Sequence, residues 1–449
     1  MYGLGVNKLG ATNKVELNDI EALFANSEQG AWYDPSDLSS LFVNSDGTGA
    51  VTVGDSVGYI KDKSGNGNHQ IQATASKQAK AARHPLGGTR TLIPYSEARV
   101  GDGWVTSAAT ATNRTDSELG YLRGVTIASG GELYSRFQGN TGLGVSVTSG
   151  ETYTVTWYYK AGTSGKARFD FRYSTAHTTI EGDIGSLAAQ SGTGGTVTLV
   201  SDTVVSGTLR KLVATWVPAA TDTEVRLGIG PFTTTSGDTV IGYGVQLEEG
   251  SSATAFQLSN TLYDVTEEGV DNLYYLDFDG IDDGYQTAST VDFTGTDTMS
   301  VFSGATKEVD ASEIIVELSS NVGSNTGVFK LGPISGDVWR WTTRGNLTVN
   351  SNASGYTPPV TSVLTGLSDS ANDYSAIRVD GVEKQVKTNN QGTVGYGDYE
   401  LNVGAKNNAF SSFLEGRIYS LIVRGVLSND SEVSTAELYV ASKTGVTLS

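Results

Sequence analysis

Short runs of alternating apolar and polar residues recur along most of the chain. The run YTVTWYYK, residues 153–160, is one example. The residues that fall on its apolar face are Tyr153, Val155, Trp157 and Tyr159. Alternation with a period of two is typical of a β-strand with one buried face, so this run predicts a half-buried antiparallel strand.

A second run, RFDFRY, follows at 168–173 with the same period. Its apolar residues are Phe169, Phe171 and Tyr173, and its polar residues are Arg168, Asp170 and Arg172. The later runs KLVATWVPA, EVRLGIG and VIGYGVQLEEG are separated by turn residues, and Trp216 in the first of them has the spacing of a core residue. Regularly spaced strands without helical segments predict one sandwich or jelly roll at 91–258.

Another set of strands fills most of the sequence from 262 onward. Asp380 and Gly381 lie between two alternating runs and predict a two-residue hairpin turn with positive φ angles. Trp339 and Trp341 share one face of VWRWTTRG, which indicates a core position or a subunit contact rather than a ligand platform. These strands predict a second antiparallel sandwich.

In the segment SNDSEVSTAELYVASKTGVTL, the apolar residues recur with the period of a helix instead of the period of a strand. We expect a helix at 429–444, capped by Ser428 or Asn429 and ended at Gly445. Its inward residues should be Val433, Ala436 and Val440.

The N-terminal segment, residues 1–30, contains one short apolar period. Asn18 is expected to cap a helix at 19–25. The residues that share one face of this helix are Ile20, Leu23 and Phe24. The segment is therefore interpreted as a small docking element.

The composition of the chain excludes several classes of site and of binding partner. The 449 residues include no cysteine, which excludes disulfides, thiolate zinc sites, iron–sulfur clusters and cysteine nucleophiles. The formal charge of −19 argues against nucleic acid or an anionic membrane as a partner, and we expect contacts with an acidic surface to be neutral or weakly polar. The sequence has no run of about 18 apolar residues, so we expect neither an export signal nor a membrane-spanning helix.

Several longer segments occur in a characteristic order. The segments EQGAWYDPSDLSSLF, VGYIKDKSGNGNHQIQAT, LDFDGIDDGYQT and EGRIYSLIVRGVLSNDSEVSTAELYVASKTGVTL enclose a second group, LIPYSEARVGDGWV, GETYTVTWYYKAG and GYGVQLEEGSSATAF. The first group resembles virion proteins of tailed phages and prophages that carry a laminin-G-like, concanavalin-like sandwich. The second group is similar to an inserted jelly roll of the carbohydrate-binding-module type.

The resemblance implies an all-β fold with two antiparallel domains, one of them discontinuous. Residues 31–88 and 262–449 would form the laminin-G-like sandwich, with the jelly roll at 91–258 inserted between them. The opening segment is too short to bury its own core, which agrees with this arrangement. The N-terminal segment at 1–30 would dock the chain to the virion.

The resemblance also implies a function. The leading hypothesis is a non-enzymatic tail fibre or receptor-binding component, located in the virion, whose lectin-like domains contact host surface glycans and other virion proteins. The alternative is a head fibre or capsid decoration protein with a structural role, and a polysaccharide-degrading enzyme is a weaker third. Assembly of such fibres implies a homo-oligomer, with a trimer as the expected form, although no heptad region is present.

The sequence contains three histidines and one acidic cluster that could carry catalysis or bind a metal ion. His69, His84 and His177 lack the sequence context of a serine hydrolase, so no catalytic residue is assigned. The acidic cluster Asp277, Asp279, Asp282 and Asp283 does not follow the ligand order of an EF-hand. We expect a strand and a tight turn there and no cofactor, with a calcium ion as the alternative.

A glycan site needs a flat ring beside polar groups that bond to sugar hydroxyls. The polar faces of the two runs described first offer such a set. The candidate glycan-binding residues are Tyr158, Lys160, Arg168, Asp170 and Arg172. The alternative is an ordinary solvated sheet face.

Overall fold

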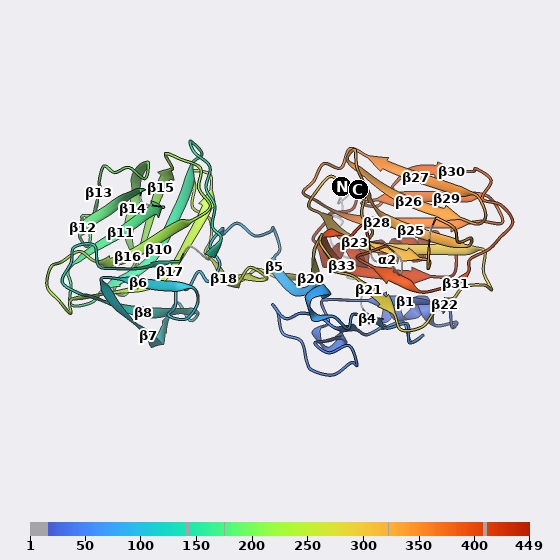
Figure 1. Cartoon of the computed structure of the whole chain (residues 1–449), viewed down its shortest axis with the longest axis horizontal. Helices are drawn as coiled ribbons and strands as arrows, with labels where there is room; N and C mark the ends of the chain where they lie inside the picture. Colours follow the sequence, from blue (N-terminus) through green and yellow to red (C-terminus); the bar gives the residue numbers. More distant parts are fainter. Residues whose placement is uncertain (1–16, 141–142, 175, 322, 407–410) are drawn as a thin grey trace, which may run out of the picture. The chain divides into compact units, whose positions relative to one another are not determined.

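The computed structural model describes residues 17–140, 143–174, 176–321, 323–406 and 411–449. The chain divides into two compact units, shown in Figure 1. One unit joins the chain up to Ala82 to Leu273–Ser449, and the other is Arg83–Asn272. Both are built from antiparallel strands, so the predicted all-β class with one discontinuous domain and a C-terminal helix is confirmed. The predicted limits of the insertion, 91 and 258, lie inside the second unit.

Two sheets form the second unit. The first contains, in spatial order, β14 (Thr196–Ser206), β15 (Leu209–Val217), β10 (Tyr153–Ala161), β17 (Thr239–Glu249), β8 (Leu122–Ser129) and β7 (Ala109–Glu118). The second contains β13 (Ala188–Ala189), β12 (Ala176–Asp183), β11 (Lys166–Tyr173), β16 (Val225–Pro231), β9 (Arg136–Gly139) and β6 (Trp104–Ser107). A hairpin of β18 (Gln257–Thr261) and β19 (Asp264–Glu267) follows in sequence.

The core of this unit lies between the two sheets. The residues predicted to face inward are all buried there: Tyr153, Val155, Trp157, Tyr159, Phe169, Phe171, Tyr173 and Trp216. Because side chains alternate along a strand, the polar residues of β11 must lie on the outer face of the second sheet.

The first unit is also a sandwich. One sheet contains β20 (Asn272–Asp279), β33 (Glu415–Arg424), β23 (Thr298–Lys307), β28 (Val360–Asp369), β29 (Tyr374–Val379) and β30 (Val382–Lys387), and β1 (Gly30–Tyr33) also pairs with β33. The other contains β2 (Leu41–Phe42), β3 (Tyr59–Ile60), β4 (Gln70–Ile71), β21 (Tyr285–Thr287), β32 (Leu401–Val403), β24 (Val316–Leu318), β25 (Val328–Ile334), β26 (Val338–Arg344) and β27 (Thr348–Ser354). β5 (Lys80–Pro85) lies next to β20 in the first of these sheets, and β22 (Val291–Asp292) and β31 (Asp398–Tyr399) form a separate two-stranded sheet.

Two local predictions for this unit are confirmed. Trp339 and Trp341 are fully buried in the core between its sheets. Asp380 and Gly381 join β29 to β30 with φ angles of 53° and 82°, as a two-residue turn with positive φ at both positions requires.

The C-terminal helix α2 (Asp430–Thr444) begins and ends close to the predicted positions. Asn429 is its N-cap, and a capping box joins Asn429 to Glu432. Gly445 ends the helix in the left-handed conformation with a φ of 72°. In Figure 1, α2 lies by β23 and β33, which it contacts.

The N-terminal helix differs from its prediction. It consists of α1 (Leu17–Glu21) followed by a 3-10 turn at Ala22–Phe24, so Asn18 lies within the helix rather than before it. Ile20, Leu23 and Phe24 are buried in a cluster with residues of α2, so this face of the segment packs as the sequence predicts. Further 3-10 turns lie at Leu38–Ser40 and Ala75–Lys77. Among the helices of the described residues, none has the length and apolar character needed to cross a membrane.

Candidate functional site

The outer face of the second sheet of unit Arg83–Asn272 carries a hollow of about 510 Å³. Its lining residues are Tyr134, Arg136, Arg168, Asp170, Arg172 and His177. We call this site the arginine hollow. Three of the residues come from β11, one from β9 and one from β12, so strands distant in the sequence build it together.

Glycines on β16 leave room for the long side chains of the arginine hollow. Gly228 lies opposite Asp170 on one side and Gln138 on the other. A Cβ atom at Gly228 would lie 3.2 Å from the Gln138 Cβ and 3.4 Å from the Arg136 Cδ. A larger residue at Gly228 would therefore press against the floor of the hollow.

Asp170 forms the centre of the hollow and is almost fully buried. Its Oδ1 accepts a hydrogen bond of 3.0 Å from the Arg168 Nη2, and its Oδ2 lies 3.7 Å from the Arg136 Nε. Arg168 also reaches Glu181, at 3.5 Å. One buried carboxylate thus holds two guanidinium groups in place.

A row of three basic residues crosses the sheet beside this carboxylate. In the strand register, Arg172 is directly opposite His177 of β12 and Arg226 of β16. The Nε atoms of Arg172 and Arg226 are buried and donate no hydrogen bond. Burial lowers the pKa of Arg172, and the nearby guanidinium groups of Arg226 and Arg168 lower it further against the opposing effect of Asp170. The row is a local excess of positive charge.

The structure brings three of the five candidate glycan-binding residues together, namely Arg168, Asp170 and Arg172. Tyr158 and Lys160 lie on β10, which belongs to the other sheet of the unit. The two sheets therefore divide the predicted set into separate places.

Tyr158 is also buried, which corrects the expectation that it faces solvent. Its side chain is 7% exposed and packs with Leu122, Leu209, Tyr243 and Phe256. The Phe256 ring meets it edge to face, with centroids 5.3 Å apart. Alternation placed Tyr158 on the outer face correctly, but it could not show that a later segment covers this face.

Lys160 is engaged within the protein. Its Nζ forms an ion pair with Glu118 of β7 and lies 5.5 Å from the centroid of the Tyr243 ring. A ligand at this position would have to replace an existing partner.

Sequence reasoning missed four residues of this surface: Tyr134, Arg136, His177 and Arg226. Arg136 and Arg226 alternate with buried Phe137, Val225 and Leu227, which is the same signal as in β11. That signal could have marked both arginines as outward-facing. The order of strands in the sheet, which places both arginines near Arg172, cannot be predicted from the local sequence pattern.

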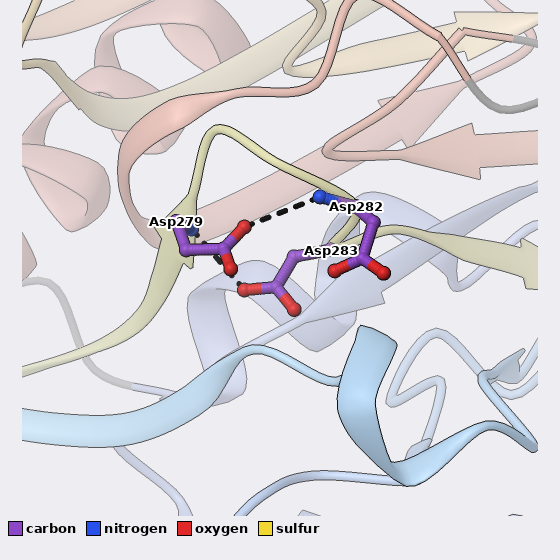
Figure 2. Close-up of side chains that lie close together, drawn as sticks. All are labelled: Asp279, Asp282 and Asp283. Atoms are coloured by element: carbon purple, nitrogen blue, oxygen red, sulfur yellow. Dashed lines mark hydrogen bonds between the residues drawn. The ribbon is translucent and has the colours of Figure 1, made fainter.

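The acidic cluster forms a second candidate site, in the other unit. Figure 2 shows Asp279, Asp282 and Asp283 close together, and carboxylate oxygens of the three lie within 4.8 Å of one another. Asp277 lies apart, with its Oδ1 3.6 Å from the Nε of Arg417.

The backbone at this cluster forms the tight turn that the sequence predicts. β20 ends at Asp279, and Gly280 follows with a φ of 73°. The Asp279 Oδ1 accepts hydrogen bonds from the backbone N–H groups of Ile281 (2.8 Å) and Asp282 (3.3 Å). The Asp279 N–H in turn donates to the Asp283 Oδ2 at 3.1 Å, as Figure 2 shows.

Electrostatics at the turn favour a proton on one carboxyl group. Burial raises the pKa of Asp283 to about 7, and the neighbouring charge of Asp279 adds to this effect. Burial also raises the pKa of Asp277 to about 6. Three close carboxylates have the donor type that calcium prefers, but calcium usually takes 6–8 oxygen ligands. The described turn therefore supplies at most part of a coordination shell.

Comparisons with known proteins were made for the whole chain. No family model matches it, and no curated protein matches it. Among solved structures, NanB sialidase from Streptococcus pneumoniae is similar over 33% of this chain, with 16% identity and a TM-score of 0.27. The similarity spans 27% of the sialidase, so this chain matches about a quarter of its length.

Two further structures are similar at the same level. The Ruminococcus gnavus IT-sialidase CBM40 bound to α2,3-sialyllactose is 11% identical, with a TM-score of 0.26 and coverage of 30% of this chain and 80% of that one. The binding domain of botulinum neurotoxin DC in complex with SialylT is 12% identical, with a TM-score of 0.29 and coverage of 37% and 42%. Likeness of this degree assigns no family.

Proposed function

We propose that this chain is a non-catalytic component of a phage particle that binds glycans at the host surface through the arginine hollow of residues 83–272. The observation that carries the glycan-binding role is the hollow itself. Its volume of about 510 Å³ lies in the range of sites for small molecules, and planar polar groups converge in it.

The side chains of the hollow suit a saccharide. Guanidinium groups donate paired hydrogen bonds in a fixed plane, which matches neighbouring oxygens on a sugar ring. Tyr134 is 47% exposed at the hollow and offers a flat ring for sugar C–H groups. Hydrogen-bond donors for sugar hydroxyls and an aromatic ring for sugar C–H groups thus lie on one surface.

The non-catalytic role is supported by the carboxylates around the hollow. Most glycosidases use two carboxyl groups that flank the scissile bond. Among the described residues, Asp170 is the one carboxylate in the lining, and it is paired with Arg168 and Arg136. We therefore expect purified protein to release no reducing ends from host polysaccharide.

The phage assignment rests on the sequence resemblance of residues 31–88 and 262–449. A head fibre or decoration protein is the alternative within the same class of particle. In that case the sandwich folds would serve as architecture, since a fold by itself does not imply a function.

Cell binding tests the proposal. The full chain, fluorescently labelled, should attach to host cells, and Tyr134→Ala should weaken attachment without lowering the melting temperature. Arg114→Ala is the matched control, because Arg114 lies on β7 in the other sheet of the same unit. Failure of the full chain to bind cells or their glycans, with loss of capsid stability in particles that lack it, would favour the decoration role.

A further inference from the structure

We propose that the arginine hollow is specific for an acidic saccharide, whose carboxylate binds at the edge of the hollow between Arg172, a lining residue, and Arg226, its neighbour on β16 outside the lining. This inference rests on the proposed glycan-binding function and adds the chemical class of the ligand. It departs from the expectation, based on net charge, that surface contacts would be neutral or weakly polar.

The first support is the pair of arginines, Arg172 and Arg226, that lie side by side on the sheet. Residues directly opposite one another on antiparallel strands have Cβ atoms about 5 Å apart, and like charges at such positions are destabilising. Arg172 has this relation to Arg226. A sequence that keeps two arginines side by side bears an electrostatic cost that a bound anion would remove.

The second support is that, among the described residues, the carboxylates near Arg172 and Arg226 leave these two arginines weakly paired. Asp170 is already shared between Arg168 and Arg136. Glu224 reaches Arg226 only at 3.5 Å and is 51% exposed. Within the described part of the chain, the Arg172 side chain donates one hydrogen bond, a long one of 3.4 Å to the carbonyl oxygen of Ser174.

The third support is the pair of buried donors. The Nε atoms of Arg172 and Arg226 donate no hydrogen bond, and a buried donor without an acceptor costs free energy. A carboxylate supplies two acceptor oxygens in the plane that a guanidinium fork prefers. A neutral sugar hydroxyl would satisfy such a donor but would not offset the charge.

The ligand should be a saccharide rather than a free anion because the hollow is larger than a carboxylate needs. Tyr134 lines the hollow, and its flat ring can pack against the sugar ring. Sialic acid and uronic acid both combine a pyranose ring with a carboxylate, so the two sources share the chemistry that the site recognises.

Calorimetry on the full chain tests the inference with four probes: 3′-sialyllactose, trigalacturonate, lactose and inorganic phosphate. We expect one of the two acidic sugars to bind at least about tenfold more tightly than lactose, because hydrogen bonds to charged groups are stronger than neutral ones. The comparison between the two acidic sugars identifies the source of the carboxylate. Phosphate should compete weakly.

Variants identify the residues involved. Arg172→Gln and Arg226→Gln should each weaken binding of the acidic sugar by about tenfold, while lactose binding changes little. Arg226→Lys keeps the charge but loses the planar fork, so it should restore binding only in part. Arg114→Gln is the control and should bind as the unaltered chain does. Melting temperatures of all variants should stay equal or rise.

The outcomes separate the two proposals. Equal binding of lactose and the acidic sugars, or unchanged binding by Arg226→Gln, overturns the acidic specificity and leaves glycan binding intact. Phosphate that competes as well as the sugars identifies a simple anion site and overturns the saccharide. Failure of every saccharide, together with failure of the full chain to bind host cells, overturns the proposed function itself.

Discussion

Asp283 is a carboxyl group whose surroundings favour the protonated form. Its pKa is raised to about 7 by burial and by neighbouring carboxylates, against about 3.9 in an unfolded chain. Between these two values the folded state holds a proton that the unfolded state releases. The contribution of Asp283 to the free energy of unfolding is therefore full below about pH 4 and is lost as the pH rises to about 7.

Asp283→Asn should weaken this pH dependence, because an amide resembles the protonated acid. We expect the free energy of unfolding in urea, compared at pH 5 and pH 8, to fall less in Asp283→Asn than in the unaltered chain. Asp398→Asn, at an exposed position of β31, is the control. An identical pH dependence in Asp283→Asn would contradict the raised pKa.

The effect of calcium on stability distinguishes a tight turn without a metal ion from a calcium site at Asp279, Asp282 and Asp283. A bound cation would hold the carboxylates ionised and would stabilise the fold at pH 8. We expect the turn alone, so the melting temperature at pH 8 should be the same in millimolar calcium and in chelator. A calcium-dependent increase that Asp279→Asn abolishes would establish a cation site.

Tyr158 and Arg172 show why only part of the arginine hollow could be predicted. Both are outward-facing in their strands, and the alternating pattern identifies this correctly for each. Tyr158 is nevertheless covered by Phe256, a residue almost one hundred positions away, whereas Arg172 is only half-buried and lines a hollow. Local alternation fixes the face of a residue, while its exposure depends on distant segments.

Packing of Tyr158 leads to a stability prediction. Tyr158→Ala should destabilise the unit by about 3–5 kcal/mol, the range for removing a core aromatic, and so should Trp157→Ala from the opposite face of β10. Urea denaturation of the two variants measures this. A loss below about 1 kcal/mol for Tyr158→Ala would mean that the face is open, and Tyr158 would again be a candidate for ligand contact.

At the scale of elements, caps were predictable because their chemistry is local. The structure gives α2 the end points that Asn429 and Gly445 indicate. In contrast, α1 includes Asn18, because the packing of Ile20, Leu23 and Phe24 against α2 determines this segment. The order of strands in a sheet could not be predicted from local pattern for the same reason. β11 pairs with β12, the next strand in sequence, but also with β16, the fifth strand after β11.

Asn429→Ala tests the contribution of the cap. Asn429 accepts hydrogen bonds from the backbone N–H groups of Ser431 and Glu432, so its loss should reduce the free energy of unfolding by about 1 kcal/mol. Denaturant titration followed by circular dichroism measures the change. Ser431→Ala serves as the control in the first turn, and an equal loss in both variants would argue against a specific capping effect.

At the scale of the whole molecule, the first unit depends on two separated parts of the chain. One continuous core contains Ala31, Leu41, Val57 and Ile60 from the early part together with Trp339 and other residues of the later part. β1 pairs with β33 along four residue pairs, which ties the two parts by backbone hydrogen bonds as well. Segments 31–88 are too short to bury such residues alone, and sequence length already suggested this dependence.

Excision of Arg83–Asn272 tests whether each unit is self-sufficient. Ala82 and Leu273 lie on the adjacent strands β5 and β20, so a short Gly/Ser linker can replace the removed residues at a small entropic cost. We expect the spliced chain to unfold cooperatively, because its core lies within its own sheets. The excised unit should also fold alone, since the core between its two sheets consists of its own residues.

A further chain with residues 273–449 alone should lose stability, because the β1 strand and the early core residues would be missing. If 273–449 unfolded at the same temperature as the spliced chain, the discontinuous unit would be refuted, and the early segment would have to be regarded as an appendage rather than as part of the sandwich.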